Sequence, residues 1–196
     1  MKVDTSLKIV NSHVIWDIMK QFSIEFRWAF TFLLAQTLWI MFERTSGFHD
    51  EKLQYQPLFS MLFNFILIAI YILAIRDKKI KIYKGQMTWQ EGFVTGLMLT
   101  LIIALFTTMT EYTKHHVISP YLLDDMKAMI LEEKRMTSEQ ADKYFSFSKT
   151  LSNSIFFTIS IGVLITSIAA WIMKSKEQAA SIPQSAPNKN KTKKRK

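Results

Sequence analysis

The stretch KIYKGQMTWQEGFVTGLMLTLIIALFTTMT, residues Lys81–Thr110, decides the fold of this chain. A basic loop that contains a glycine leads into Thr88-Trp-Gln-Glu91, which has the spacing of a helix capping box: the threonine hydroxyl accepts from the backbone at Glu91, and the glutamate reaches back. No residue is charged from Phe93 to Thr110. This pattern predicts a helix that starts beside a basic loop and enters an apolar environment. Thr137 and Gln140 have the same spacing and predict a second helix start.

Four stretches of the 196-residue chain contain no charged residue, which predicts a membrane protein. A helix needs about 20 residues to cross a bilayer core of about 30 Å. Three stretches approach that length. Glu25 and Arg27 extend the first one to the interface, because an arginine there can stretch toward water. The four stretches are Trp28–Phe42, Gln54–Ile75, Gly92–Thr110 and Thr150–Met173.

We therefore expect an all-α integral membrane protein with four transmembrane helices in an antiparallel bundle. Its membrane domain covers residues 24–175. An external, amphipathic helical segment, residues 111–150, separates the third and fourth helices and begins its first helix at Ser119-Pro120. The predicted spans are residues 24–42, 58–75, 89–110 and 151–173.

The two ends of the chain differ from this domain. In residues 1–23, apolar residues recur at helical spacing, which predicts either an amphipathic helix at the cytoplasmic interface or an extension of the first span. Residues 176–196 contain Pro183, Pro187 and the run KNKTKKRK, and no apolar pattern, so we expect a disordered cytoplasmic tail. The tail can attract anionic lipid or remain solvated. We expect no nucleic-acid partner.

The distribution of lysine and arginine predicts the orientation. The connection at residues 76–87 contains five of these residues, and the segment from Lys174 contains eight, whereas the connection between the first two spans contains only Arg44 and Lys52. Because basic residues concentrate in cytoplasmic loops, both termini should be cytoplasmic and residues 111–150 should face outward.

Two stripes of small residues predict how the third and fourth spans pack. In each stripe the residues are four apart, so they follow one side of a helix, and small side chains allow close approach of two helices in lipid. We expect the two faces to meet within one chain; pairing of two chains through one stripe is the alternative. The first stripe is Gly92, Gly96, Thr100, Ala104 and Thr108, and the second is Thr158, Gly162, Thr166 and Ala170.

A polar layer is predicted at similar depth in the outer half of the spans. It consists of Gln36, Asn64, Thr107 and Asn153, one from each span. Such residues either surround a pocket that opens outward or bond between helices, which satisfies polar groups in lipid. The sequence favours the second interpretation.

Several classes of function have no support in the sequence. The chain has no cysteine and no ionisable residue at the middle of a span, which argues against thiolate sites and charge-relay transport. No phosphate loop or nucleophile motif occurs. Glu111, His115 and His116 have spacing that arises by chance. We expect no metal site, no cofactor and no enzymatic activity.

One resemblance extends over most of Phe26–Met173. Its marks are Gly85 and Thr88-Trp89 before the third span, a small residue within that span (Gly92 or Gly96), and Pro120 at the start of the external segment. These features resemble an uncharacterised family of small bacterial four-span membrane proteins, catalogued as a domain of unknown function. The resemblance implies four spans in a bacterial inner membrane and supplies no activity. The N-terminal segment and the basic tail depart from it.

Two functions are compatible with this pattern. The first is a non-enzymatic accessory or assembly partner of another membrane protein. Its contact surface would be an apolar stripe on the external helix, which otherwise packs on the bilayer or on the chain itself. The alternative is a small transporter or channel subunit that uses the polar layer. The apolar stripe consists of Leu122, Met126, Met129 and Ile130.

Overall fold

The computed structural model describes residues 3–175, with side chains from residue 22 onward, and all regular structure in this part of the chain is helical. The N-terminal segment continues without a break into the first long helix. The predicted amphipathic side chains of residues 1–21 and the predicted disordered tail lie outside the described residues. The elements are α1 (Val3–Thr45), η1 (Leu53–Tyr55), α2 (Gln56–Met61), α3 (Phe63–Lys81), α4 (Trp89–Thr113), η2 (Lys114–Ile118), α5 (Leu122–Glu132), α6 (Ser138–Tyr144) and α7 (Phe147–Met173).

Three helical segments in the described chain are long and apolar enough to cross a membrane. They are Leu53–Lys81 with 29 residues, Trp89–Ile118 with 30 and Phe147–Met173 with 27. Each exceeds the roughly 20 residues that a bilayer core requires. The chain is therefore a candidate multi-pass membrane protein that contacts the lipid bilayer.

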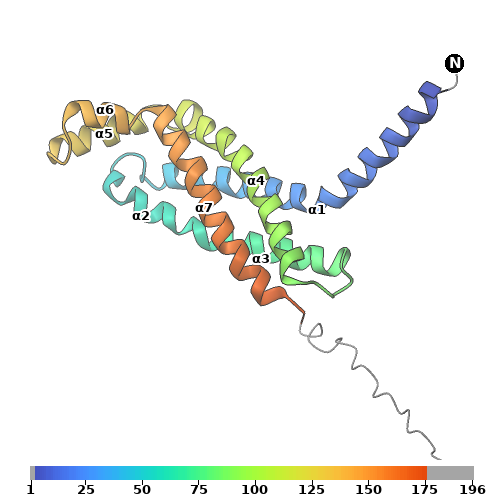
Figure 1. The fold of residues 1–196 in the computed structure, drawn as a ribbon. Coiled ribbons are helices and arrows are strands. Elements are labelled where there is room, and N and C mark those ends of the chain that lie inside the picture. Colours follow the sequence, from blue (N-terminus) through green and yellow to red (C-terminus); the bar gives the residue numbers. More distant parts are fainter. Residues whose placement is uncertain (1–2, 176–196) are drawn as a thin grey trace, which may run out of the picture.

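The long helices pack side by side, with α4 and α7 crossing in front of α1 and α3 (Figure 1). Buried side chains from all four meet in one core, among them Phe32, Tyr71, Leu99 and Ile165. The short helices α5 and α6 lie together at one end of this core. The connection between α3 and α4 lies at the other end, where the described part of α7 finishes (Figure 1).

Hydrogen bonds tie the end of α7 to the connection between α3 and α4. The backbone N–H of Ser175 donates to the carbonyl of Met87 at 2.8 Å, and Lys79 Nζ donates to the carbonyl of Met173 at 2.7 Å. The contact from Lys79 satisfies a carbonyl in the last turn of α7, which has no partner within the helix. The two contacts place the basic connection and the end of α7 on the same side of the core.

Both predicted capping boxes are confirmed. The hydroxyl of Thr88 accepts from the backbone N–H of Glu91 at 3.2 Å, and the Glu91 carboxylate accepts from the backbone N–H of Thr88 at 2.7 Å. Thr137 and Gln140 exchange the corresponding bonds at the start of α6. Each exchange satisfies two donors at a helix N-terminus.

Helix α3 is longer than the sequence predicts, because it passes Arg76 and continues to Lys81. Basic residues near a helix C-terminus interact favourably with its dipole. In addition, Asp77 pairs with Arg27, and Lys78 pairs with the fully buried Glu25 of α1. These contacts with α1 hold the last turns of α3 in helical form.

The two small-residue faces lie against each other in one chain. A Cβ added at Gly96 would lie 2.5 Å from both Cγ2 and Oγ1 of Thr166, and one at Gly162 would lie 2.6 Å from Cγ2 of Thr100. At Gly92 the nearest atom would be Cβ of Ala170, at 3.1 Å. Glycine therefore permits the approach of α4 and α7 at these positions.

Thr108 does not lie on this face. Its side chain is exposed, whereas Ala104 and Thr107 are buried, and the Thr107 hydroxyl lies 3.3 Å from that of Thr158. Residues four apart rotate by about 40° beyond a full turn, because an α-helix has 3.6 residues per turn. Between Gly92 and this end of α4 the rotation accumulates, so Thr107 takes the place on the packed face that was predicted for Thr108.

We predict that Gly96→Ala lowers the free energy of unfolding by about 1–3 kcal/mol, as overpacking does. Thr166 is fully buried and β-branched, so its side chain cannot turn away at low cost. Gly92→Ala, with its longer closest approach, should cost less. Denaturant unfolding in detergent micelles measures both, and partial recovery in Gly96→Ala with Thr166→Ala would show the contact. Equal stability of the wild type and Gly96→Ala would contradict this packing.

Candidate functional site

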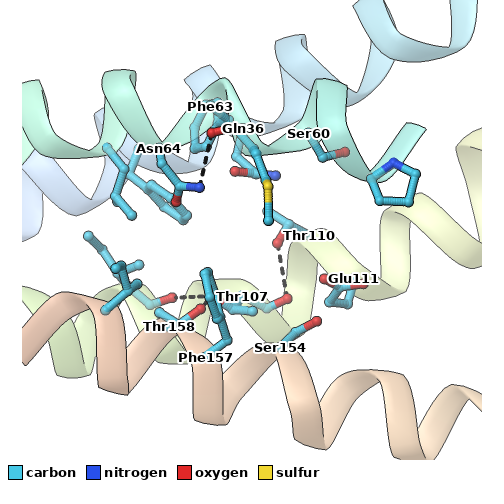
Figure 2. Close-up of a pocket in the computed structure, with 16 residues that line it drawn as sticks. Gln36, Ser60, Phe63, Asn64, Thr107, Thr110, Glu111, Ser154, Phe157 and Thr158 are labelled. Carbon is cyan, nitrogen blue, oxygen red and sulfur yellow. Dashed lines mark hydrogen bonds between the residues drawn. The ribbon is translucent and has the colours of Figure 1, made fainter. Parts of the chain in front are cut away.

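Three of the four residues of the predicted polar layer line one cavity of about 220 Å³: Gln36, Asn64 and Thr107. The cavity lies between α1, α3, α4 and α7, and polar side chains reach it from opposite walls (Figure 2). Its remaining wall is apolar and includes Phe32 and Phe63. The arrangement is therefore amphipathic, as is usual for sites that hold small molecules.

Asn153, the fourth member of the predicted layer, does not line this cavity. Its side chain is exposed, and it lines a second cavity of about 220 Å³ between α5, the end of α6 and the start of α7. Ser154 and Thr158 are the α7 residues with hydroxyls that line the first cavity. Ser154 lines both cavities, whereas Asn153, one residue earlier and rotated by about 100° around the helix, lines the second and not the first.

Glu111 and Thr110 also line the first cavity, although the predicted polar layer does not contain them. The predicted third span ends at Thr110, and Glu111 belongs to the predicted external segment. In the structure α4 continues to Thr113 and then forms the π-helical turn Lys114–Ile118. The four-residue spacing from Thr107 to Glu111 was the available signal, since it places both residues on one side of a helix.

Most hydroxyl protons around the first cavity are already engaged. Thr107 Oγ1 donates to the carbonyl of Ile103 at 3.0 Å, and Thr110 Oγ1 donates to that of Thr107 at 3.0 Å. Because the Thr107 proton is engaged, Thr158 is the donor in the contact between their hydroxyls. These side chains therefore present oxygen lone pairs to the cavity.

The two amides of the cavity differ. Asn64 Nδ2 donates to the carbonyl of Met61 at 3.0 Å (Figure 2). Gln36 has no hydrogen-bond partner among the described residues, although its side chain is half-buried. An amide without a partner in an apolar environment is costly, since a lost hydrogen bond is not replaced by water. The Gln36 amide is therefore free to bond to a molecule in the cavity.

His115 is buried and Glu111 is half-buried, and each has buried atoms that lack hydrogen-bond partners. His115 Nε2 lies 3.2 Å from Oε2 of Glu111, which is within ion-pair distance, but the geometry does not make a hydrogen bond. Oε2 of Glu111 and both ring nitrogens of His115 have no hydrogen-bond partner among the described residues. Glu111 lines the first cavity, whereas His115 lines the second. Short π-helical segments of the kind that follows Glu111 are frequent at functional sites.

A separate buried network surrounds Glu43 near the C-terminal end of α1. Its Oε1 accepts from Trp39 Nε1 at 2.7 Å and from Ser60 Oγ at 2.5 Å, and its Oε2 lies 3.2 Å from Nε2 of His49. His49 Nδ1 lies 2.5 Å from Oγ of Ser119. The network therefore joins α1, the following connection and the segment that leads into α5.

The carboxyl group of Glu43 is held in its charged form. Burial raises its pKa, but the hydrogen bonds from His49, Ser60 and Trp39, together with the charge of Lys114, outweigh burial and hold the pKa below its ordinary value. The charged carboxylate is thus the acceptor around which the network is built.

The apolar stripe of α5 is partly covered by the chain itself. Leu122 is buried, and Met126, Met129 and Ile130 are half-buried. Helix α6 packs against α5, and Leu122 and Met126 line the second cavity. The stripe faces the chain's own helices more than it faces outward.

The described residues contain no group of three or more histidine, aspartate or glutamate side chains arranged to hold a metal ion. Glu111 and His115 are adjacent, as their spacing indicates, but no third such side chain joins them.

We predict that acid weakens the fold through Glu43. Its pKa is lower in the folded chain, so the charged carboxylate stabilises the fold above the ordinary carboxyl pKa of about 4.3, and this stabilisation decreases as pH falls toward the lowered value. Glu43→Gln should lower the free energy of unfolding at pH 7 by about 1–3 kcal/mol and make it less pH-dependent. Denaturant unfolding from pH 7 down to about pH 2, which covers the range below the ordinary carboxyl pKa, measures this. The exposed Glu51→Gln is the control, and identical pH profiles for Glu43→Gln and the wild type would contradict the role of Glu43.

Comparison with known proteins gives a family and no activity. The family model described as "Protein of unknown function (DUF4199)" matches residues 27–175, from Arg27, which directly precedes the uncharged part of α1, to the residue that bonds to Met87. No curated protein and no solved structure matches the chain. The resemblance noted in the sequence is confirmed, and the matched region contains the cavity and the Glu43 network. The chain belongs to the DUF4199 family.

Proposed function

We propose that the chain is a four-span protein of a bacterial inner membrane, with both termini in the cytoplasm, that binds a small molecule in the first cavity without catalysing a reaction. In this role it is a transporter or channel subunit. The observation that carries the proposal is the convergence of Gln36, Asn64, Thr107 and Glu111 on one amphipathic cavity. Convergent polar groups in an otherwise apolar pocket are the usual mark of a binding site.

The exposed face of α1 supports a fourth span. Four large apolar side chains, each at least half exposed, recur four residues apart at Phe26, Phe30, Leu34 and Leu38. On the opposite face Ala29 and Phe32 are buried in the core. An exposed apolar stripe on a helix that packs against two of the candidate spans, through α3 and α4, is best covered by lipid.

Polar residues explain why α1 is less apolar than the other three candidates. Arg27, Gln36 and Glu43 interrupt it. The uncharged stretch between Arg27 and Glu43 spans about 22 Å at 1.5 Å per residue, which is shorter than a bilayer core of about 30 Å. Arg27 can extend toward the interface and pairs there with Asp77. A shorter span is thus compatible with the membrane.

Orientation follows from the basic connection between α3 and α4. Its contacts with the end of α7 put the basic residues that precede and follow these helices on one side. In the proposal that side is the cytoplasm, and the Glu43 network together with α5 and α6 lies outside.

Small-molecule binding is favoured over the accessory role because the polar groups without partners lie at the cavity, whereas the apolar stripe of α5 is largely covered. The apolar stripe expected to contact a partner is buried or half-buried against the chain itself. By contrast, Gln36 and Glu111 present polar atoms without partners to the cavity or its edge. The accessory role remains the second candidate, supported by the half-exposed residues of α5.

We predict the following labelling of single cysteines, which is possible because the natural chain has none. An impermeant thiol reagent added to intact cells should label cysteines at Asp50 and Ser138 and should not label those at Ser6 and Ser181. Permeabilised cells control for access to each site. Labelling at both Ser6 and Asp50 in intact cells would contradict a span in α1, and labelling at Ser181 in place of Ser138 would reverse the orientation.

We also predict that Gln36→Leu with Asn64→Leu removes a bound small molecule from the protein without reducing its folded amount. Both leucines preserve approximate side-chain size while removing the polar atoms. Native mass spectrometry after gentle extraction measures the retained mass, and Thr108→Leu, on the exposed face, is the control. A second protein at stoichiometric ratio, with no small molecule in the wild type, would support the accessory role and contradict this one.

A further inference from the structure

The chemistry of the first cavity narrows the class of molecule that it accepts, and this inference rests on the proposed binding role. The cavity wall is rich in hydrogen-bond acceptors. The hydroxyl protons of Thr107, Thr110 and Thr158 are engaged within the protein, and Ser60 donates to Glu43. Oxygen lone pairs remain, and they accept bonds from a molecule that donates.

Glu111 adds a carboxylate to the same wall. Its Oε2 is buried and has no hydrogen-bond partner among the described residues, and Ser154 interacts with the same carboxyl group. The basic side chains nearest to Glu111, Lys114 and His115, line the second cavity and not the first. His115 Nε2 nevertheless lies 3.2 Å from Oε2 of Glu111, so a cation in the first cavity would share the carboxylate with that ring.

Aromatic rings complete the wall. Phe32 and Phe63 are buried and pack edge to face, with ring centroids 5.8 Å apart, and Phe157 lines the same cavity from α7. Aromatic faces attract cations and also pack against apolar groups. A molecule with an ammonium group and a short apolar body satisfies both the acceptors and the rings.

The volume sets the size of that molecule. A cavity of about 150 Å³ is sufficient for benzene, and drug-sized ligands occupy at least about 300 Å³. The first cavity, at about 220 Å³, lies between these limits. We propose that it binds a small organic cation, an ammonium carried on a short aromatic or aliphatic group, with Glu111 as the counter-ion.

Three probes with one carbon skeleton test this inference: 2-phenylethylamine, which is cationic, 2-phenylethanol, which is neutral, and phenylacetate, which is anionic. Titration calorimetry with the purified full chain measures their affinities, and empty micelles correct for partitioning. We expect the amine to bind about tenfold or more tightly than the alcohol, as a charge-assisted hydrogen bond predicts, and phenylacetate to bind least.

Glu111→Gln keeps the size of the side chain and removes its charge, so it should abolish the preference for the amine. Glu132→Gln, which alters an exposed glutamate of the same external side, should retain it. The probe series on the wild type decides the question even if Glu111→Gln does not fold.

The outcomes separate this inference from the proposed function. Equal affinities for amine and alcohol in the wild type, or a preference for the amine that survives Glu111→Gln, would overturn the cation and leave the binding role in place. Absence of binding by all three probes would also contradict the proposal that the cavity binds an organic cation. The proposed binding role is then tested separately, by whether Gln36→Leu with Asn64→Leu removes a bound small molecule.

Discussion

The close approach of α4 and α7 is the constraint on which the rest of the structure depends. Lipid supplies no hydrophobic force between helices, so membrane helices associate through close contacts and interhelical hydrogen bonds. Here Gly96 lies against Thr166, and Gly162 lies against Thr100 and the hydroxyl of Tyr71, which itself bonds to Thr100 at 2.8 Å. Further along the pair, hydroxyl groups and not glycine form the contact, at Thr107 and Thr158. The half of the α4–α7 pair that contains Gly96 and Gly162 holds the two helices together, and the half that contains Thr107 and Thr158 borders the first cavity.

Hydroxyl groups show how the chain manages polarity in an apolar environment. Within the described helices, Thr37, Thr95, Thr100 and Ser167 each donate to the carbonyl four residues earlier, which satisfies the hydroxyl inside its own helix. Polar groups without such a partner stand out against this background. Gln36 and Glu111 are of this kind and both line the first cavity, which is why we place binding there. Thr166 also lacks a partner, but the close packing around it leaves no space for a ligand.

Local rules predicted much of this fold, and helix rotation limited the rest. The capping boxes, the three most apolar spans and the positions of Gly96 and Gly162 on the packed faces of α4 and α7 follow from spacing within each helix. Spacing could not show that Thr107, and not Thr108, would be buried, because small rotations accumulate along a helix. The Glu43 network was missed since its members come from segments far apart in the sequence, up to Ser119, and only tertiary packing joins them. The position of Glu111 in the cavity wall could not be predicted from the uncharged stretch, because α4 continues past the end of that stretch at Thr110 to Thr113.

The central claim, that α4 and α7 pack on each other within one chain, can be tested by a disulfide between cysteines at Gly92 and Ala170. A Cβ at Gly92 would lie 3.1 Å from Cβ of Ala170, slightly shorter than the usual range of about 3.5–4.5 Å for a disulfide, so a small shift of the helices permits the bond. The natural chain has no cysteine to compete. Oxidation in native membranes should give a cross-link within the monomer, whereas a control pair at Gly92 and the exposed Ile168 should not react. A disulfide-linked dimer, or no cross-link at all, would contradict the account.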